Sequence, residues 1–78
     1  MSRLTEIAHN LVFEADVEAR DLAASLKKPY STLMRELNPY DTGAKLGAET
    51  LLQIMEETGI VAPLEYMAAR LGYHLVKN

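Results

Sequence analysis

Apolar residues recur at spacings of three and four along most of this chain, which is the spacing of residues on one face of an α-helix. The first such run predicts a helix over residues 3–15 and consists of Leu4, Ile7, Ala8, Leu11 and Val12. Only residues 73–77 lack a clear pattern, and they are compatible with a strand, an extended tail or a contact between two copies. The periodicity therefore favours an all-α fold.

Proline divides the next part of the chain into two short helices. Asp16 is expected to cap the first of them, because its short carboxylate can accept a hydrogen bond from a free backbone N–H. This second helix of the chain should end near Leu26. Pro29 interrupts it and suits the first turn of a third helix, which is predicted over residues 29–37.

Glycine and proline also mark out the second half of the chain. Residues 38–47 are predicted to form a loop, followed by a fourth helix over 47–59 and a fifth over 63–72. Gly59 suits a left-handed helix cap. The apolar stripe of the fifth helix is expected to face the core and consists of Leu64, Met67, Ala68 and Leu71. Short connections predict that the second and third helices, and the fourth and fifth, are neighbours.

A stretch of 78 residues is expected to form one small domain, spanning residues 1–78, because it is too short for two. At this mass, a compact fold exposes about 4,700 Å² of the roughly 12,600 Å² that the unfolded chain exposes. The chain has no cysteine, which excludes disulfides and cysteine-based zinc sites. No apolar run has the length of a membrane-spanning helix or a signal peptide, so we expect a soluble, cytoplasmic protein.

The residues that most often carry catalysis or bind metals are few and scattered. His9 and His74 are the only histidines, and neither has a partner at metal-ligand spacing. Glu56 and Glu57 are read as a solvated helix face, because paired catalytic carboxylates need a cleft. We therefore expect no enzymatic activity, metal, cofactor, small-molecule substrate or membrane partner.

The two short helices around the turn, at about residues 18–38, are predicted to form a helix-turn-helix. On a helical wheel, Tyr30, Leu33 and Leu37 cluster on one side of the third helix and are expected to face the core. The opposite side carries five hydrogen-bond donors and no acid: Lys28, Ser31, Thr32, Arg35 and Asn38. Such a face suits the DNA major groove, where arginine reads guanine and hydroxyls reach bases or phosphates.

The charge distribution points to the same segment. Residues 27–45 carry four basic and two acidic side chains, whereas the rest of the chain carries four basic and nine acidic ones. The net charge of the whole chain is −3. Because nonspecific DNA affinity comes mostly from neutralising phosphates, we expect weak nonspecific binding and a strong dependence on dimerisation.

The same residues resemble a known family. Leu22-Ala23-x-x-Leu26 followed by Ser31-Thr32-Leu33-x-Arg35-x-Leu37-Asn38 resembles the helix-turn-helix of lambda-repressor-like domains of the Cro and CI type. More narrowly, the chain is similar to the phage regulatory protein CII family. The similarity lies in Ser31-Thr32-Leu33-Met34-Arg35-Glu36-Leu37-Asn38-Pro39, followed by Gly43-Ala44-Lys45-Leu46 and the helix of residues 51–59. The similarity covers roughly residues 18–72 and implies a five-helix, DNA-binding transcriptional regulator from a phage or prophage.

The resemblance also implies which residues contact DNA. The positions that it places at the bases are Tyr30, Ser31, Thr32 and Met34, with Lys28, Arg35 and Asn38 beside them. Lys45 and the loop before the fourth helix would contact phosphates. One departure from the family pattern is in the turn, where glycine and a small apolar residue are usual and Lys27 and Lys28 stand instead. If the turn needs a left-handed residue, Lys27 is strained by about 1 kcal/mol relative to glycine.

A homodimer is expected, because a single domain of this size buries only about 600–1,000 Å² on DNA. A two-fold DNA site should then have half-sites about 34–36 Å apart. Tyr66, Tyr73, Ile60 and Val61 are candidate dimer contacts, the tyrosines because aromatic residues are enriched at interfaces.

The alternative is a protein-interaction module, such as an antirepressor or adaptor. In that case the helix-turn-helix is structural and the acidic surface of the last two helices binds a basic partner. Burial of the polar face of the third helix would rule out DNA reading.

Overall fold

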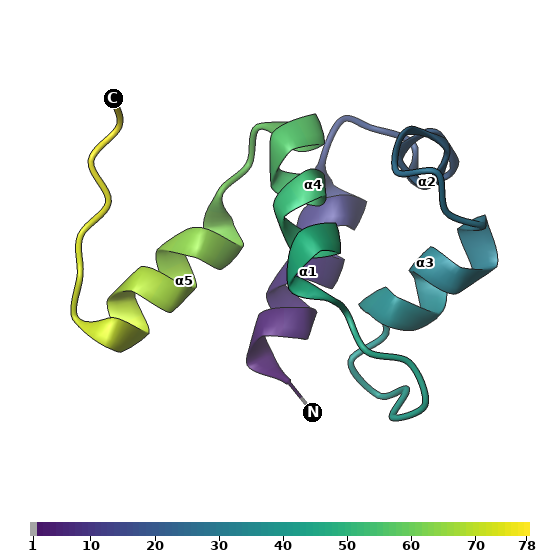
Figure 1. The fold of residues 1–78 in the computed structure, drawn as a ribbon, viewed down its shortest axis with the longest axis horizontal. Helices are drawn as coiled ribbons and strands as arrows, with labels where there is room; N and C mark the ends of the chain where they lie inside the picture. Colours follow the sequence, from purple (N-terminus) through teal and green to yellow (C-terminus); the bar gives the residue numbers. More distant parts are fainter. Residues whose placement is uncertain (1) are drawn as a thin grey trace.

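The computed structural model describes residues 2–78, and within that range it contains five helices and no strand (Figure 1). The helices are α1 (Arg3–Glu14), α2 (Ala19–Ser25), α3 (Tyr30–Leu37), α4 (Ala48–Thr58) and α5 (Ala62–Leu71). The all-α, five-helix prediction is confirmed. None of the helices in residues 2–78 combines the length and apolar character needed to cross a membrane.

One hydrophobic core joins the first four helices. It consists of Ala8, Leu11, Val12, Leu22, Ala23, Leu26, Leu33, Leu37, Leu51, Ile54 and Met55. α1 packs against α3 and α5, and α2 packs against α3 and α4. The three largest aliphatic side chains with no exposed surface, Leu33, Leu37 and Ile54, come from α3 and α4. The apolar periodicity of these helices thus marks their buried faces, as expected.

Three helix ends follow local capping rules. The Ser2 hydroxyl accepts a hydrogen bond from the Thr5 backbone N–H at the start of α1, at 3.2 Å. Gly59 and Gly72 have φ of 73° and 85° and end α4 and α5 in the left-handed conformation, which glycine adopts without steric cost. The prediction for Gly59 is confirmed.

The start of α2 differs from the prediction. The helix begins at Ala19, its N-cap is Glu18, and no side chain makes a capping hydrogen bond there. The assignment of Asp16 as the cap is therefore wrong. Val17 packs against the core from the connection before the helix.

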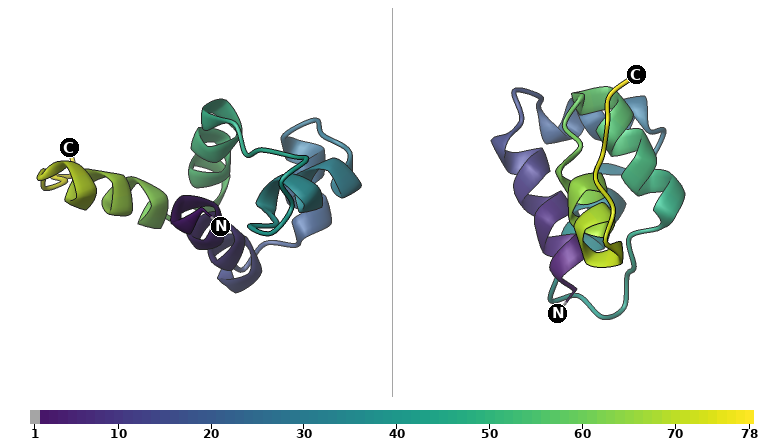
Figure 2. Two further views of the ribbon diagram at one scale, coloured as in Figure 1. Left: turned by 90° about the horizontal axis from the view of Figure 1, so that it is seen from below. Right: turned by 90° about the vertical axis from the view of Figure 1, so that its left-hand side faces the viewer.

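α5 is the element that departs most from expectation. It makes its main contacts with α1 rather than with α4, although a short connection precedes it. Of its apolar stripe, Leu64 is 40% and Leu71 is 74% exposed, so the expectation that these residues lie in the core is wrong. Figure 2 shows α5 projecting from the other four helices, and in Figure 1 the C-terminal tail turns away from the far end of α5. The molecule measures 35 × 27 × 20 Å, and α5 and α3 lie towards opposite ends of its longest axis (Figure 1).

Candidate nucleic-acid interface

The turn between α2 and α3 is a left-handed cap with a lysine in it. The Lys27 N–H donates to the Ala24 carbonyl at 3.1 Å, and the Lys28 N–H donates to the Ala23 carbonyl at 3.0 Å. This pair of hydrogen bonds is the Schellman pattern, whose left-handed position is usually occupied by glycine. Here Lys27 occupies it with φ of 57°, the one positive φ of a residue other than glycine in residues 2–78. The strain anticipated for Lys27 is thus located in the turn that orients α3.

The outer face of α3 is open to solvent. Leu33 and Leu37 are fully buried on the inner face, whereas Ser31, Thr32 and Arg35 are exposed on the outer one. Asn38, directly after the helix, and Lys45, in the loop before α4, are also exposed. Five of the residues assigned to DNA are therefore accessible together on α3 and the loop that follows it.

Tyr30 and Met34 are accessible only in part. Both are half-buried and pack against the core. The guanidinium of Arg20, on α2, lies over the Tyr30 ring, 4.2 Å from its centroid. This cation–π contact joins the first turns of the two helices. Arg20 is exposed, and it is a candidate phosphate contact that sequence reasoning did not identify.

Lys28 forms an ion pair with Glu36, which lies on α3. Its ammonium Nζ lies 3.1 Å from Glu36 Oε1 and 3.3 Å from Oε2. Both side chains are largely shielded, with 26% and 16% of their surface exposed. The charge of Lys28 is therefore already neutralised before any phosphate approaches. Among residues 2–78, no ion pair involves Lys27 or Lys45.

Arg35 is held by the loop that follows its helix. Its Nε donates to Asp41 Oδ2 at 3.0 Å, and its Nη2 lies 3.4 Å from Oδ1. The Gly43 N–H also donates to Asp41 Oδ1, at 2.9 Å. These contacts lower the pKa of the Asp41 carboxyl, chiefly through Arg35 and then through Gly43, and the same ion pair raises the pKa of Arg35. The side chain of Arg35 remains 60% exposed, so it is oriented without being covered.

Gly43 lies close to the end of the Arg35 side chain. A Cβ at that position would lie 3.0 Å from Arg35 Nη2, closer than most real Cβ contacts. Asp41 thus positions the Arg35 guanidinium, and the backbone N–H of Gly43 in turn holds Asp41. The pattern Asp-x-Gly in a loop is a sign of a side-chain-closed turn, but nothing in the sequence indicates that Arg35 is its partner.

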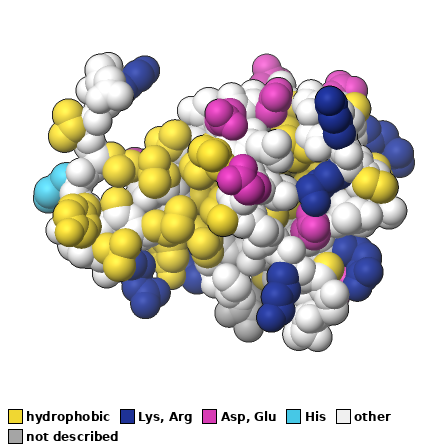
Figure 3. All heavy atoms as spheres, in the orientation of Figure 1, with side chains coloured by type: hydrophobic (Ala, Val, Ile, Leu, Met, Phe, Trp, Pro, Cys, Tyr) yellow, Lys and Arg dark blue, Asp and Glu magenta, His cyan; other side chains and the backbone are white. Residues whose placement is uncertain are grey.

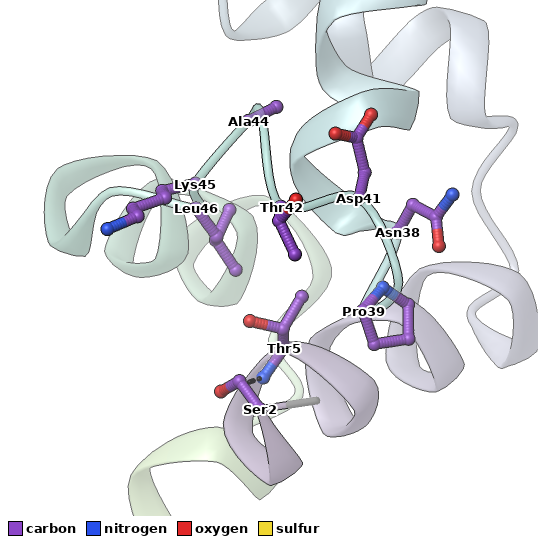
Figure 4. A pocket seen from close by; sticks show the side chains of 9 residues that line it. All are labelled: Ser2, Thr5, Asn38, Pro39, Asp41, Thr42, Ala44, Lys45 and Leu46. Atoms are coloured by element: carbon purple, nitrogen blue, oxygen red, sulfur yellow. Dashed lines mark hydrogen bonds between the residues drawn. The ribbon is translucent and has the colours of Figure 1, made fainter.

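The loop between α3 and α4 is ordered by its own hydrogen bonds. Asn38 Oδ1 accepts from the Tyr40 N–H at 3.0 Å, which leaves the amide N–H₂ of Asn38 as its remaining donor. Between this loop and the start of α1 lies an open hollow of about 560 Å³ (Figure 4). Lys45 extends from the edge of the hollow. Seen from the face in Figure 3, Lys and Arg side chains gather mainly over the half of the molecule that carries α2, α3 and this loop.

The model of the family described as phage regulatory protein CII (CP76) matches residues 2–78. No curated protein and no solved structure matches the chain.

Proposed function

This chain belongs to the phage regulatory protein CII family, and we propose that it regulates transcription by binding double-stranded DNA sequence-specifically as a homodimer. The observation that carries the proposal is the outer face of α3, where Ser31, Thr32 and Arg35 stand exposed on a helix whose other face is buried. In this mode α2 crosses the DNA backbone and α3 enters the major groove.

The residues divide into two roles. Ser31, Thr32 and Arg35 reach the base edges, where a guanidinium pairs with the two acceptors of guanine and hydroxyls pair with bases or phosphates. Tyr30 and Met34 add apolar contact through their exposed parts. The phosphates are contacted by Lys45, the Asn38 amide and Lys28. Lys28 reaches a phosphate only when that phosphate replaces Glu36 as the partner of its ammonium group.

Asp41 gives Arg35 its specificity. A free arginine side chain loses much rotational freedom when it pairs with a base, whereas this one is already held at Nε and Nη2 by a carboxylate. The negative charge of Asp41 also offsets part of the attraction between Arg35 and phosphate. Both effects favour reading of a base over general attraction to the DNA backbone, in keeping with the low nonspecific affinity expected of a chain with net charge −3.

The proposal is tested by mapping where DNA binds. Random-sequence duplex added to isotope-labelled protein at low salt should shift the backbone amide signals of α3, the 38–47 loop and the start of α2. Shifts confined to α4 and α5, or no shifts, would contradict the proposal. Confinement to α4 and α5 would favour the protein-interaction alternative, in which acidic helices bind a basic partner.

A matched pair of variants sharpens this test. Thr32 and Gln53 are both exposed helix positions, on α3 and α4 respectively. Thr32→Glu should weaken DNA binding by more than about tenfold, because it sets a negative charge against the DNA. Gln53→Glu adds the same charge to a surface that does not face the DNA, and should change binding far less. Equal losses in the two variants would show that only net charge matters.

A further inference from the structure

Two adjacent lysines form the turn between α2 and α3, and their surroundings differ sharply. Lys28 is half-buried, whereas Lys27 is exposed and has a left-handed backbone, with φ of 57°. The sequence pattern associates Lys28 with DNA and treats Lys27 only as a departure within the turn. The structure allows the two lysines to be assigned separate roles.

Lys28 is committed to Glu36. Its ammonium Nζ lies 3.1 Å from Glu36 Oε1, an atom that is buried and has no hydrogen-bond partner among residues 2–78. If Lys28 turned to a DNA phosphate, this buried carboxylate oxygen would lose the positive charge that compensates for its burial. Breaking one side of a shielded ion pair is costly for that reason. The Lys28 side chain therefore serves mainly to hold the carboxylate of α3 in the folded chain.

Lys27 has no such commitment. Its backbone N–H donates to the Ala24 carbonyl, but this hydrogen bond needs no side chain. Within residues 2–78, no ion pair involves its ammonium group. Glycine would form the same turn without the steric cost of a left-handed Cβ. Residues held in such conformations cluster at functional sites, so the side chain of Lys27 is a candidate for a role outside the folded chain.

The position of the turn indicates what that role is. Lys27 comes three residues before Tyr30, where α3 begins. When a recognition helix lies in the major groove, its N-terminal residues contact the base edges. The turn that precedes α3 then lies at the edge of the groove, along which the phosphates run. A lysine side chain there is a flexible stem that carries a compact positive charge, and it can follow a phosphate without a fixed geometry.

We propose that Lys27 contacts a DNA phosphate, and that it, rather than Lys28, is the cation by which this turn holds DNA of random sequence. The inference rests on the proposed function, because it takes α3 to be the helix that enters DNA. It adds a contact from the one left-handed residue other than glycine in residues 2–78. Glycine would suit the turn better, whereas lysine supplies the charge that DNA binding needs.

The test compares two variants that lose the same side chain and the same charge from neighbouring positions. The binding of Lys27→Ala and Lys28→Ala to a labelled random-sequence duplex is followed by fluorescence anisotropy over a range of salt concentrations. Each phosphate contact adds about 0.9 to the slope of log K against log salt. Lys27→Ala should lower the slope by about 0.9 for each chain bound, and weaken binding about fivefold at about 150 mM salt. Lys28→Ala should lower the slope by less than half as much.

Stability should respond in the opposite order. Lys28→Ala leaves the buried oxygen of Glu36 without its partner and should lower Tm, whereas Lys27→Ala keeps both the turn and its Cβ and should leave Tm close to that of the parent. If Lys28→Ala does not fold, Lys28→Ala combined with Glu36→Gln takes its place in the DNA assay, because it removes the buried charge as well. Lys27→Arg is the conservative control, and its slope should match that of the parent.

The outcomes separate this inference from the proposed function. If the parent binds random duplex and Lys28→Ala lowers the slope as much as Lys27→Ala or more, the assignment of Lys27 is wrong while DNA binding stands. An unchanged slope in Lys27→Ala would refute the assignment equally. If the parent binds no DNA even at low salt, the proposed function fails and the phosphate contact fails with it.

Discussion

Replacing Lys27 with glycine should stabilise the domain, although it removes a side chain from the helix-turn-helix. Lys27 is exposed and has φ of 57°, so its Cβ is held in a conformation that disfavours every residue with a side chain. The Schellman hydrogen bonds around it, from the N–H groups of Lys27 and Lys28, do not depend on the side chain. Glycine therefore keeps the turn and removes the steric cost.

The expected gain is the difference between two terms. Relief of the left-handed conformation contributes about 1–2 kcal/mol. The greater freedom of glycine in the unfolded chain offsets about 0.4–1 kcal/mol of this. At the middle of the two ranges the net stabilisation is about 0.8 kcal/mol, which for a domain of this size raises Tm by about 3–6 °C.

Lys27→Ala is the control, because it removes the same charge and the same aliphatic chain but keeps the Cβ. Thermal unfolding followed by circular dichroism should place Lys27→Gly above both the parent and Lys27→Ala. Binding to DNA should change equally in the two variants, since both lose one positive charge. If Lys27→Gly melts no higher than Lys27→Ala, the turn is not strained and the account of it is wrong.

Three further predictions concern the ion pair, the loop and the core. Because Arg35 lowers the folded-state pKa of Asp41, the pair stabilises the fold above the ordinary Asp pKa and this contribution is lost as the pH falls through the lower folded value. The urea midpoint of the parent should therefore drop on acidification below about pH 4 by more than that of Asp41→Asn. Lys45→Ala should weaken binding to all DNA sequences alike and lower the salt slope by about one, and a sequence-selective defect would argue against a phosphate contact. Leu33→Ala, at a fully buried site, should cost about 2–5 kcal/mol in chemical denaturation; a loss below about 1 kcal/mol would contradict the core assignment.

The number of helices and most of the core could be predicted from sequence because both depend on short-range periodicity. Leu33 and Leu37 fall on one face of α3 whatever the rest of the chain does, and Gly59 ends α4 for local steric reasons. For the turn at Lys27 the sequence left the conformation open, because the family pattern has glycine there and this chain has lysine, and the structure shows that Lys27 is left-handed. The start of α2 was not predicted, because the helix begins at Ala19 without a capping side chain, so the capping ability of Asp16 does not locate it.

The ion pairs of the candidate interface could not be predicted from spacing. Glu36 is eight residues from Lys28, and Asp41 is six from Arg35, so neither pair has the three- or four-residue spacing of helix neighbours. Both depend on the turn and the loop at the two ends of α3. The position of α5 was missed for a related reason: its stripe shows that the helix has an apolar face, but not which surface covers that face.

The most direct test of the proposed function is selection of binding sites from a random duplex library at about 150 mM salt, a concentration that screens most nonspecific attraction. The parent should enrich a two-fold motif. Arg35→Ala should bind the preferred site about 5- to 150-fold more weakly and lose selectivity at one base pair in each half-site. If Arg35→Ala binds the preferred site as tightly as the parent and selects the same motif, Arg35 does not contact the bases. Failure of the parent to enrich any sequence would contradict sequence-specific DNA binding itself.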